Sequence, residues 1–150
     1  MDEIDAKILN ILQSDARTSN AELARQVGMA PSGVLERVRK LEERGTILRY
    51  EARLDARALG AGLLAFTFVR ADEPVGAPVT EAALAAIPEV QEVHNVAGED
   101  CYLVKLRVAD TAALQTVLRD RIGAIPTVTS TRTTIVLSTT KETTNVPVRP

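Results

Sequence analysis

The chain has 150 residues, of which 45% are hydrophobic and 25% are charged, and its net charge is −2. This length suffices for two small hydrophobic cores, and the absence of a long apolar run or a signal peptide predicts a cytoplasmic protein without a membrane partner. A single cysteine excludes an intramolecular disulfide framework, and one cysteine with one histidine cannot form a structural zinc site from this chain alone.

Short helices are predicted at the start of the chain. Asp2–Gln13 has isoleucine and leucine at helical spacing, with acidic residues at its beginning that suit the positive end of a helix. A second helix begins at a cap formed by Ser19 or Asn20, with Glu22 as the partner in a capping box. Gly28 ends this helix, because glycine readily adopts the left-handed conformation found there.

A third helix is predicted to begin at Pro31, a residue suited to a first helical turn. Val34, Val38 and Leu41 recur on one side of this helix and point inward, whereas a basic stripe runs along its solvent-facing side. Two helices joined by a glycine-centred turn, the second of them basic, are typical of a helix-turn-helix that binds double-stranded DNA. The predicted DNA contacts are Arg25, Arg37, Arg39, Lys40 and Arg44 with phosphates, and Ser32 and Glu36 with bases.

The alternative interpretation of this basic stripe is a solvated helix face without a ligand. The turn between Gly28 and Pro31 favours the helix-turn-helix. The distribution of charge agrees, since residues 17–49 contain seven Lys and Arg against four Asp and Glu, whereas residues 61–150 contain eight against ten. Phosphate neutralisation is local, so a chain of net negative charge can bind DNA with an affinity that falls as salt rises.

Thr46–Leu54 alternates well enough for a strand or an extended arm, and is interpreted as a wing or an interdomain connector. The glycines of the Gly60-Ala61-Gly62 sequence mark a boundary after it. The predicted organisation is a DNA-binding domain at 1–50, a connector at 51–61, a second domain at 62–140 and a tail at 141–150. The polar, proline-containing tail suggests either a loose extension or a segment that packs across a partner subunit.

The second domain is predicted to contain four strands and two helices. The strands are Leu63–Arg70, Val90–Ala97, Cys101–Val108 and Thr127–Leu137; the helices are Thr80–Ile87 and Asp110–Ile122; Asp72–Pro78 forms a turn. This βαββαβ order predicts a ferredoxin-like sandwich, so the whole chain is an α+β protein. Two helices cover only one face of the sheet, and the exposed apolar face predicts a homodimer whose two DNA half-sites lie roughly 34 Å or a multiple apart.

Two segments, ELARQVGMAPSGVLERVRKLEERGTI and VHNVAGEDCYLVKLRV, resemble the Lrp/AsnC (leucine-responsive, feast/famine) family of transcriptional regulators, and the resemblance covers residues 1 to 140. It implies an N-terminal winged helix-turn-helix and a C-terminal ligand-sensing domain of the RAM type. It also implies assembly as dimers, and often octamers, with a small effector, usually an amino acid, bound between subunits.

The resemblance also implies an effector-binding loop with the pattern Gly-x-x-Asp-Tyr. In this chain Gly98 and Tyr102 fit that pattern, Cys101 stands where the family has Asp, and the acid is one place earlier, at Asp100. Backbone N–H groups of such a turn can bind a carboxylate, while an acidic side chain can pair with an amine. The predicted effector-binding residues are Gly98, Glu99, Asp100, Cys101 and Tyr102, with hydroxyls from Thr131, Thr133 and Thr134 of a neighbouring subunit. A plain hairpin turn with exposed acids is the alternative.

The sequence therefore predicts a DNA-binding transcriptional regulator that responds to an amino-acid effector and has no cofactor or metal. An architectural DNA-packing protein and a metabolite-binding sandwich remain as alternatives. His94 and Cys101 suggest a thiolate pair, but no orienting group or oxyanion-hole motif accompanies them, so no enzyme is predicted.

Overall fold

The computed structural model describes residues 1–74 and 76–149. Val75, inside the predicted Asp72–Pro78 turn, and Pro150, at the end of the predicted tail, lie outside the described residues. No helix of the described chain combines the length and the apolar character needed to cross a membrane.

The chain forms two compact units. The first unit comprises Met1–Arg53 together with Lys141–Pro150, and the second comprises Leu54–Thr140. The division between them falls inside the predicted connector.

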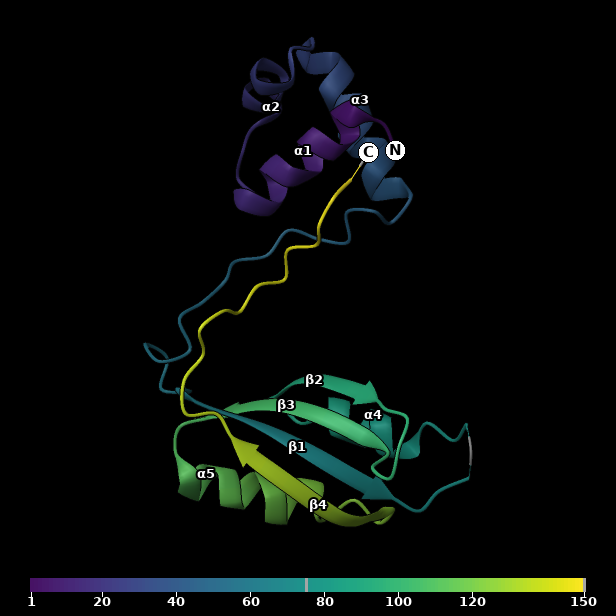
Figure 1. Cartoon of the computed structure of the whole chain (residues 1–150), viewed down its shortest axis with the longest axis vertical. Helices are drawn as coiled ribbons and strands as arrows, with labels where there is room; N and C mark the ends of the chain where they lie inside the picture. The colour runs from purple at the N-terminus through teal and green to yellow at the C-terminus, as the bar shows by residue number, and fades with distance from the viewer. Residues whose placement is uncertain (75, 150) are drawn as a thin grey trace. The chain divides into compact units, whose positions relative to one another are not determined.

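Three helices build the first unit (Figure 1): α1 at Glu3–Ser14, α2 at Asn20–Val27 and α3 at Pro31–Glu43. The capping signals explain these limits. The Asp2 carboxylate accepts from the N–H groups of Ile4 and Asp5, both at 2.9 Å. Gly28 ends α2 with φ +72°, a conformation that side chains with a Cβ disfavour. These features confirm the predicted helices to within one or two residues at each end.

The capping box predicted for α2 is only half present. The Ser19 hydroxyl accepts from the Glu22 N–H at 3.2 Å, as expected. The Glu22 carboxylate does not return to the cap but accepts from the Arg25 side chain, with 2.9 Å between Oε2 and Nε, and from Gln26. A charged donor on the same helix face replaces the weaker backbone bond.

Seven apolar side chains form the core of the first unit: Ile8, Leu9, Leu23, Ala24, Val34, Val38 and Leu41. Part of the tail belongs to this unit. The Gln13 side-chain amide donates to the Val146 carbonyl at 3.0 Å and accepts from the Val146 N–H at 2.6 Å, and Val148 packs against the core. The tail is therefore held on this unit by hydrogen bonds between the Gln13 side chain and the Val146 backbone.

The strand interpretation of Thr46–Leu54 is wrong for the described chain, which has no strand there. No neighbouring strand offers hydrogen-bond partners to this segment, and Leu48 and Leu54 are exposed. The helix-turn-helix in the described residues therefore has no strand as a wing, and the connector interpretation stays a prediction.

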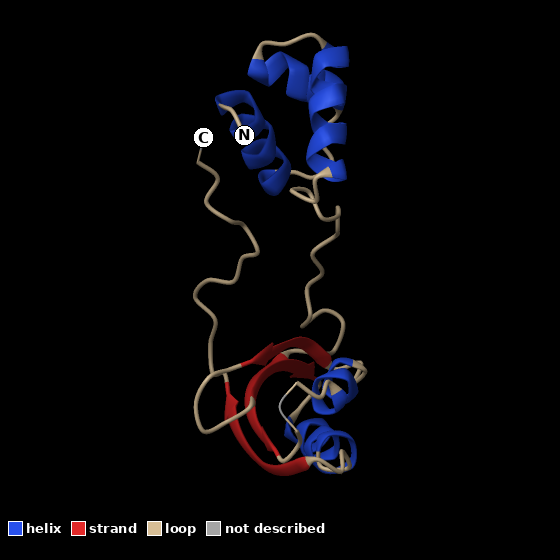
Figure 2. Cartoon of the chain, turned by 90° about the vertical axis from the view of Figure 1, so that its right-hand side faces the viewer, coloured by secondary structure: helices blue, strands red, loops and turns tan. Residues whose placement is uncertain are grey.

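The second unit is a four-stranded antiparallel sheet with two helices on one face (Figure 2). Its elements are β1 at Leu63–Ala71, α4 at Val79–Ala85, β2 at Val90–Asn95, β3 at Tyr102–Val108, α5 at Thr111–Thr116 with a following π-helical turn η1 at Val117–Ile122, and β4 at Val128–Ile135. The strand order is β2-β3-β1-β4. This order and the element sequence confirm the predicted βαββαβ arrangement.

Alternation along the strands determines the two faces of this sheet. Ala65, Val69, Val104 and Leu106 are fully buried with the helices. Thr67 is also fully buried among them, and its hydroxyl lies 3.0 Å from the Thr133 hydroxyl on β4, which gives the buried group a hydrogen-bond partner.

The other sheet face carries apolar and charged side chains together. Phe66 and Phe68, on the alternate positions of β1, are half-buried. The guanidinium of Arg132 lies 4.3 Å from the centre of the Phe68 ring, a cation–π contact. Lys105 pairs with Glu92 at 3.1 Å. This face is thus less purely apolar than the sequence suggests, and the helices of the unit lie against the opposite face of the sheet (Figure 2).

Candidate DNA-binding and effector sites

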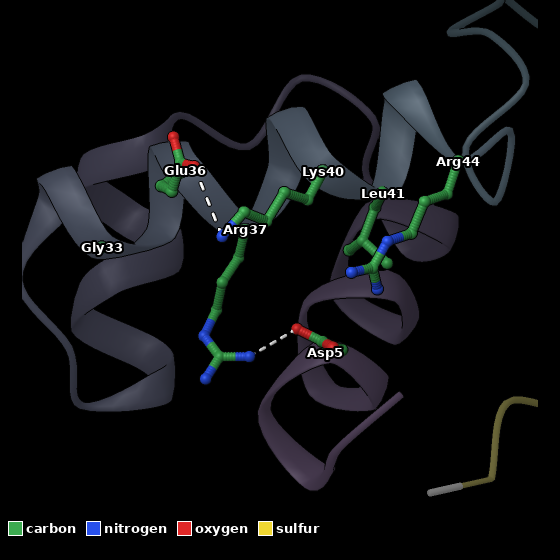
Figure 3. Close-up of a pocket in the computed structure, with 7 residues that line it drawn as sticks. All are labelled: Asp5, Gly33, Glu36, Arg37, Lys40, Leu41 and Arg44. Carbon is green, nitrogen blue, oxygen red and sulfur yellow. Dashed lines mark hydrogen bonds and ion pairs between the residues drawn. The ribbon is translucent and has the colours of Figure 1, made fainter.

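Arg37 is committed to two carboxylates on the neighbouring helix. Its Nη1 lies 2.7 Å from Asp2 Oδ2 and 2.7 Å from Asp5 Oδ1, and Figure 3 shows the side chain reaching from α3 toward α1. The hydrogen bond that Arg37 donates to Asp2, followed by the one that it donates to Asp5, raises the pKa of Arg37 above its usual range. The pair of contacts fixes the N-terminus of α1 to α3, so a phosphate contact by Arg37 requires exchange of these partners.

Arg39, Lys40 and Glu36 form a network on the solvent-facing side of α3. Glu36 accepts from two nitrogens of Arg39, at 2.8 and 3.1 Å, and lies 3.4 Å from Lys40 Nζ. Arg39 also contacts Glu43 at 2.7 Å. The hydrogen bond from Arg39 lowers the pKa of Glu36, so this carboxylate stays ionised. Lys40 is therefore the less tightly held of the two cations.

Arg25, on α2, is also paired within its own helix, and its hydrogen bonds lower the pKa of Glu22 to about 2. Arg44 differs, because it is exposed and makes no ion pair with any described residue. Since exposed ion pairs contribute little free energy, phosphates can compete for the paired cations. Arg44 needs no such exchange and is the most available predicted phosphate contact.

A cleft of about 380 Å³ lies between α1 and α3 (Figure 3). It is lined by Asp5, Gly33, Glu36, Arg37, Lys40, Leu41 and Arg44. Positive and negative side chains share this cleft: Arg37 and Lys40 are on α3, and Arg44 is the residue that follows its end. The structure thus brings four of the seven predicted DNA contacts together here, whereas Arg25, Ser32 and Arg39 lie outside the cleft lining.

The predicted effector loop connects β2 and β3. Gly98 has φ +139°, which strongly favours glycine. Two arginines from neighbouring strands hold this loop: Arg70 donates to the Glu99 carbonyl at 3.1 Å, and Arg132 contacts Asp100 Oδ2 at 2.9 Å. The Glu99 carboxylate lies 3.5 Å from Arg70 Nη2, a longer ion pair than the one between Asp100 and Arg132, and its side chain is 93% exposed. Glu99 is therefore the freer of the two acids for pairing with an amine.

Cys101 and Tyr102 are turned toward the protein interior. Cys101 Sγ contacts both backbone groups of Ala71, each at 3.4 Å. The Tyr102 hydroxyl donates to Glu73 at 2.8 Å, and this bond, with burial, raises the tyrosine pKa to about 12. Tyr102 is only 4% exposed. Its position in the loop motif therefore serves to hold the segment after β1 in place.

The three threonines predicted to supply hydroxyls lie on different faces of β4. Thr133 pairs with Thr67 in the register with β1, on the face that the helices cover. Thr134 pairs with Phe66 on the other face, and Thr131 pairs with Val69. Adjacent positions of a strand point to opposite sides, so one ligand cannot contact all three threonines of one chain.

The thiolate pair considered from the sequence is not supported by the contacts. His94 Nε2 lies 3.1 Å from Glu92 Oε2, and the hydrogen bond lowers the pKa of that carboxyl. Cys101 contacts Ala71 instead. In the described part of the chain no group of three or more His, Cys, Asp or Glu is arranged to hold a metal ion.

Several residues with roles in these sites were missed by sequence reasoning. Asp2 and Asp5 hold Arg37, although they are more than 30 positions away in the sequence. Arg70 and Arg132 hold the loop after β2. No local signal identifies these pairs, because they depend on helix packing and on strand register.

Known proteins share both units. Residues 64–146 match the Lrp/AsnC ligand binding domain, and residues 1–42 match the AsnC-type helix-turn-helix domain. The chain is 41% identical over 149 residues to HTH-type transcriptional regulator FL11 of Pyrococcus horikoshii, with 99% of this chain and 97% of the relative covered. It is 41% identical over 146 residues to the leucine-responsive regulatory protein of Salmonella typhimurium, with 95% and 88% covered.

Solved structures agree with these relationships. A transcriptional regulator of Neisseria meningitidis in complex with L-Met superimposes with a TM-score of 0.93 at 31% identity, covering 98% of this chain and 96% of that one. The feast or famine regulatory protein of M. tuberculosis complexed with L-methionine gives 0.90 at 36% identity, covering 99% of each chain. A helix-turn-helix unit joined to this α+β unit defines a class of transcriptional regulator. The chain belongs to the Lrp/AsnC family.

Proposed function

We propose that this protein binds double-stranded DNA sequence-specifically through α2 and α3, and that an amino acid bound by its second unit changes this binding. The basic side of α3 carries the DNA part of the proposal. Family membership supports it, and the two relatives in complex with L-methionine support an amino acid as the effector. With DNA and an amino acid as its partners, the protein acts in the cytoplasm and catalyses no reaction in this proposal.

The DNA surface that we propose is the exposed side of α3 with Arg25 from α2. Arg44 contacts a phosphate directly, while Lys40, Arg39, Arg25 and Arg37 exchange carboxylate partners for phosphates. The start of α3 contributes as well, because Ala30 provides no side-chain cap. Pro31 has no N–H, and the Gly33 N–H donates to the Ala30 carbonyl at 3.0 Å, so the Ser32 N–H is the one that we propose for an anion. Ser32 and Glu36 lie at this end, where recognition helices reach base edges.

For the effector, we propose the loop from Gly98 to Tyr102 at an interface between two copies of the chain. Exposed Glu99 pairs with the ammonium group, and backbone N–H groups of the loop bind the carboxylate. Asp100 supports the loop through Arg132. Thr131 and Thr133 lie on one face of β4 and Thr134 on the other. The threonine hydroxyls that contact one effector therefore come from different chains.

A homodimer formed through the open sheet face supports both proposals. The half-buried Phe66 and Phe68 gain burial in such a dimer, and a twofold axis presents two α3 helices to one duplex. Further assembly to an octamer is an extension of the same proposal by analogy with the family. The mass of the assembly, measured by light scattering with and without L-methionine, tests both.

An architectural DNA-packing role is the second candidate. The observation that favours it is the engagement of Arg39 by Glu36 and Glu43, which leaves few free donors to read bases. DNase I footprinting on the DNA upstream of the protein's own gene separates the two functions. Discrete protected half-sites support sequence-specific regulation, whereas uniform protection at all concentrations supports packing.

A further inference from the structure

Leu35 is an exposed apolar residue on the basic helix of the first unit. Its relative exposure is 55%, and among the described residues of α1, α2 and α3 no other large hydrophobic residue is exposed. Its helix neighbours Val34 and Val38 are buried in the core. The exposure of Leu35 is therefore not the rule for apolar positions in these helices.

Leu35 lies on the side of α3 that we propose to face DNA. At 100° per residue it lies well away from the inward row of Val34, Val38 and Leu41. Ser32 precedes it by three residues and Arg39 follows by four, and both are neighbours on the helix surface. Leu35 is also the fifth residue of α3, in the N-terminal half that reaches base edges in helix-turn-helix proteins.

The charged neighbours of Leu35 are occupied by one another. Arg39 contacts Glu36 at 2.8 and 3.1 Å and Glu43 at 2.7 Å. In the protein without DNA this guanidinium faces two carboxylates, and on DNA we assign it to a phosphate, so it does not read guanine in bidentate geometry. Apart from the short side chains of Pro31 and Ser32, Leu35 is the exposed side chain in this described part of the helix that no ion pair holds.

Only one base presents an apolar group at its edge in the major groove, the C5 methyl group of thymine. We propose that Leu35 determines sequence specificity by contacting a thymine methyl group in each half-site. This inference rests on the proposed DNA-binding function and adds to it the kind of base that the helix reads. It also explains how α3 discriminates sequences although its long donors are paired.

The test replaces thymine by deoxyuridine, which removes the methyl group and keeps the hydrogen-bonding pattern. A preferred duplex is first obtained by in vitro selection from random DNA with the full-length protein. Each thymine in one half-site is then replaced in turn, and the Kd is measured for the unmodified protein and for Leu35→Ala. Leu48→Ala is the matched control, because Leu48 is 87% exposed and lies outside the three helices.

For the unmodified protein and Leu48→Ala, replacement at one thymine should raise the Kd about fourfold, the effect of one buried methyl-sized group, and about fifteenfold when both half-sites are changed. Leu35→Ala should bind the thymine and deoxyuridine duplexes equally at that position. Circular dichroism should show an unchanged helix content, since the side chain is exposed. These results support the proposal.

Discrimination that persists unchanged in Leu35→Ala overturns the proposal, and so does an unmodified protein that binds all deoxyuridine duplexes as tightly as the parent. In both cases the selected sequence still shows specific DNA binding. A selection that enriches no sequence, with equal binding to all duplexes, overturns the sequence-specific function itself as well as the role of Leu35.

Discussion

The salt dependence of DNA binding distinguishes Arg37, on α3, from Arg44, which directly follows this helix. Arg44 has no carboxylate partner among the described residues, whereas Arg37 contacts Asp2 and Asp5 at 2.7 Å each. Each phosphate that a protein neutralises contributes about −0.9 to the slope of log K against log salt. Arg44→Ala should therefore reduce the magnitude of the slope by about 0.9 per protomer, or about 1.8 for a dimer.

Between 50 and 200 mM salt, a slope change of about 1.8 alters the ratio of affinities by about twelvefold. Fluorescence anisotropy with one labelled duplex at four salt concentrations measures this change. Arg37→Ala should reduce the slope by less, because in the protein without DNA the Arg37 guanidinium already has two anionic partners. It should instead lower the unfolding temperature of the first unit by about 2–5 °C, since a partly exposed ion-pair cluster is lost.

The opposite pattern would refute this reasoning. If Arg37→Ala flattens the salt dependence by the full amount and leaves the unfolding temperature unchanged, the carboxylate contacts of Arg37 do not persist on DNA. An unchanged slope in Arg44→Ala would remove this residue from the phosphate contacts. Asp5→Asn, which weakens one partner of Arg37 without touching a cation, is the control for changes in helix packing.

Three further predictions concern the rest of the structure. Gly98→Val should abolish the response to the effector, because valine strains the loop backbone at φ +139°. DNA binding without the effector should persist, because the added Cβ meets no atom within 4 Å. A parallel loss of both in titrations would indicate misfolding. Leu84→Ala should lower the free energy of unfolding of the second unit by about 2–5 kcal/mol in urea, whereas a smaller loss would mean that the core collapses around the site. The Glu22 pKa is lowered from 4.5 to about 2 in the folded state, so its stabilising effect is present above pH 4.5 and is lost as the pH falls toward 2; acid titration of Glu22→Gln should lack this component.

Local signals made the helices and strands predictable. Ser19, Gly28 and Pro31 each determine a helix end through their own backbone and side-chain chemistry, and alternation of apolar residues predicts each strand. The same signal was misleading for Thr46–Leu54, where alternation suggested a strand but the described chain has none. A strand needs a partner edge, and this information is outside the segment.

The sites were only partly predictable because their contacts join distant parts of the chain. In the sequence Arg37 is one member of a basic stripe, but its carboxylate partners at the start of α1 come close only when the helices pack. Tyr102 matches a family motif, yet the register of β3 turns its hydroxyl toward Glu73. Periodicity identifies the face of an element; it does not show which charged groups on that face are already paired.

The central claim is that an amino acid changes sequence-specific DNA binding, and one titration tests it directly. The full-length protein is titrated into a labelled duplex from upstream of its own gene and into a scrambled duplex, at two salt concentrations, with L-methionine and then each other amino acid. We predict a preference for the upstream duplex and a shift in its Kd of at least about fivefold with one of the amino acids, as expected for coupling between two sites. Equal binding to both duplexes, unchanged by every amino acid, would contradict the account.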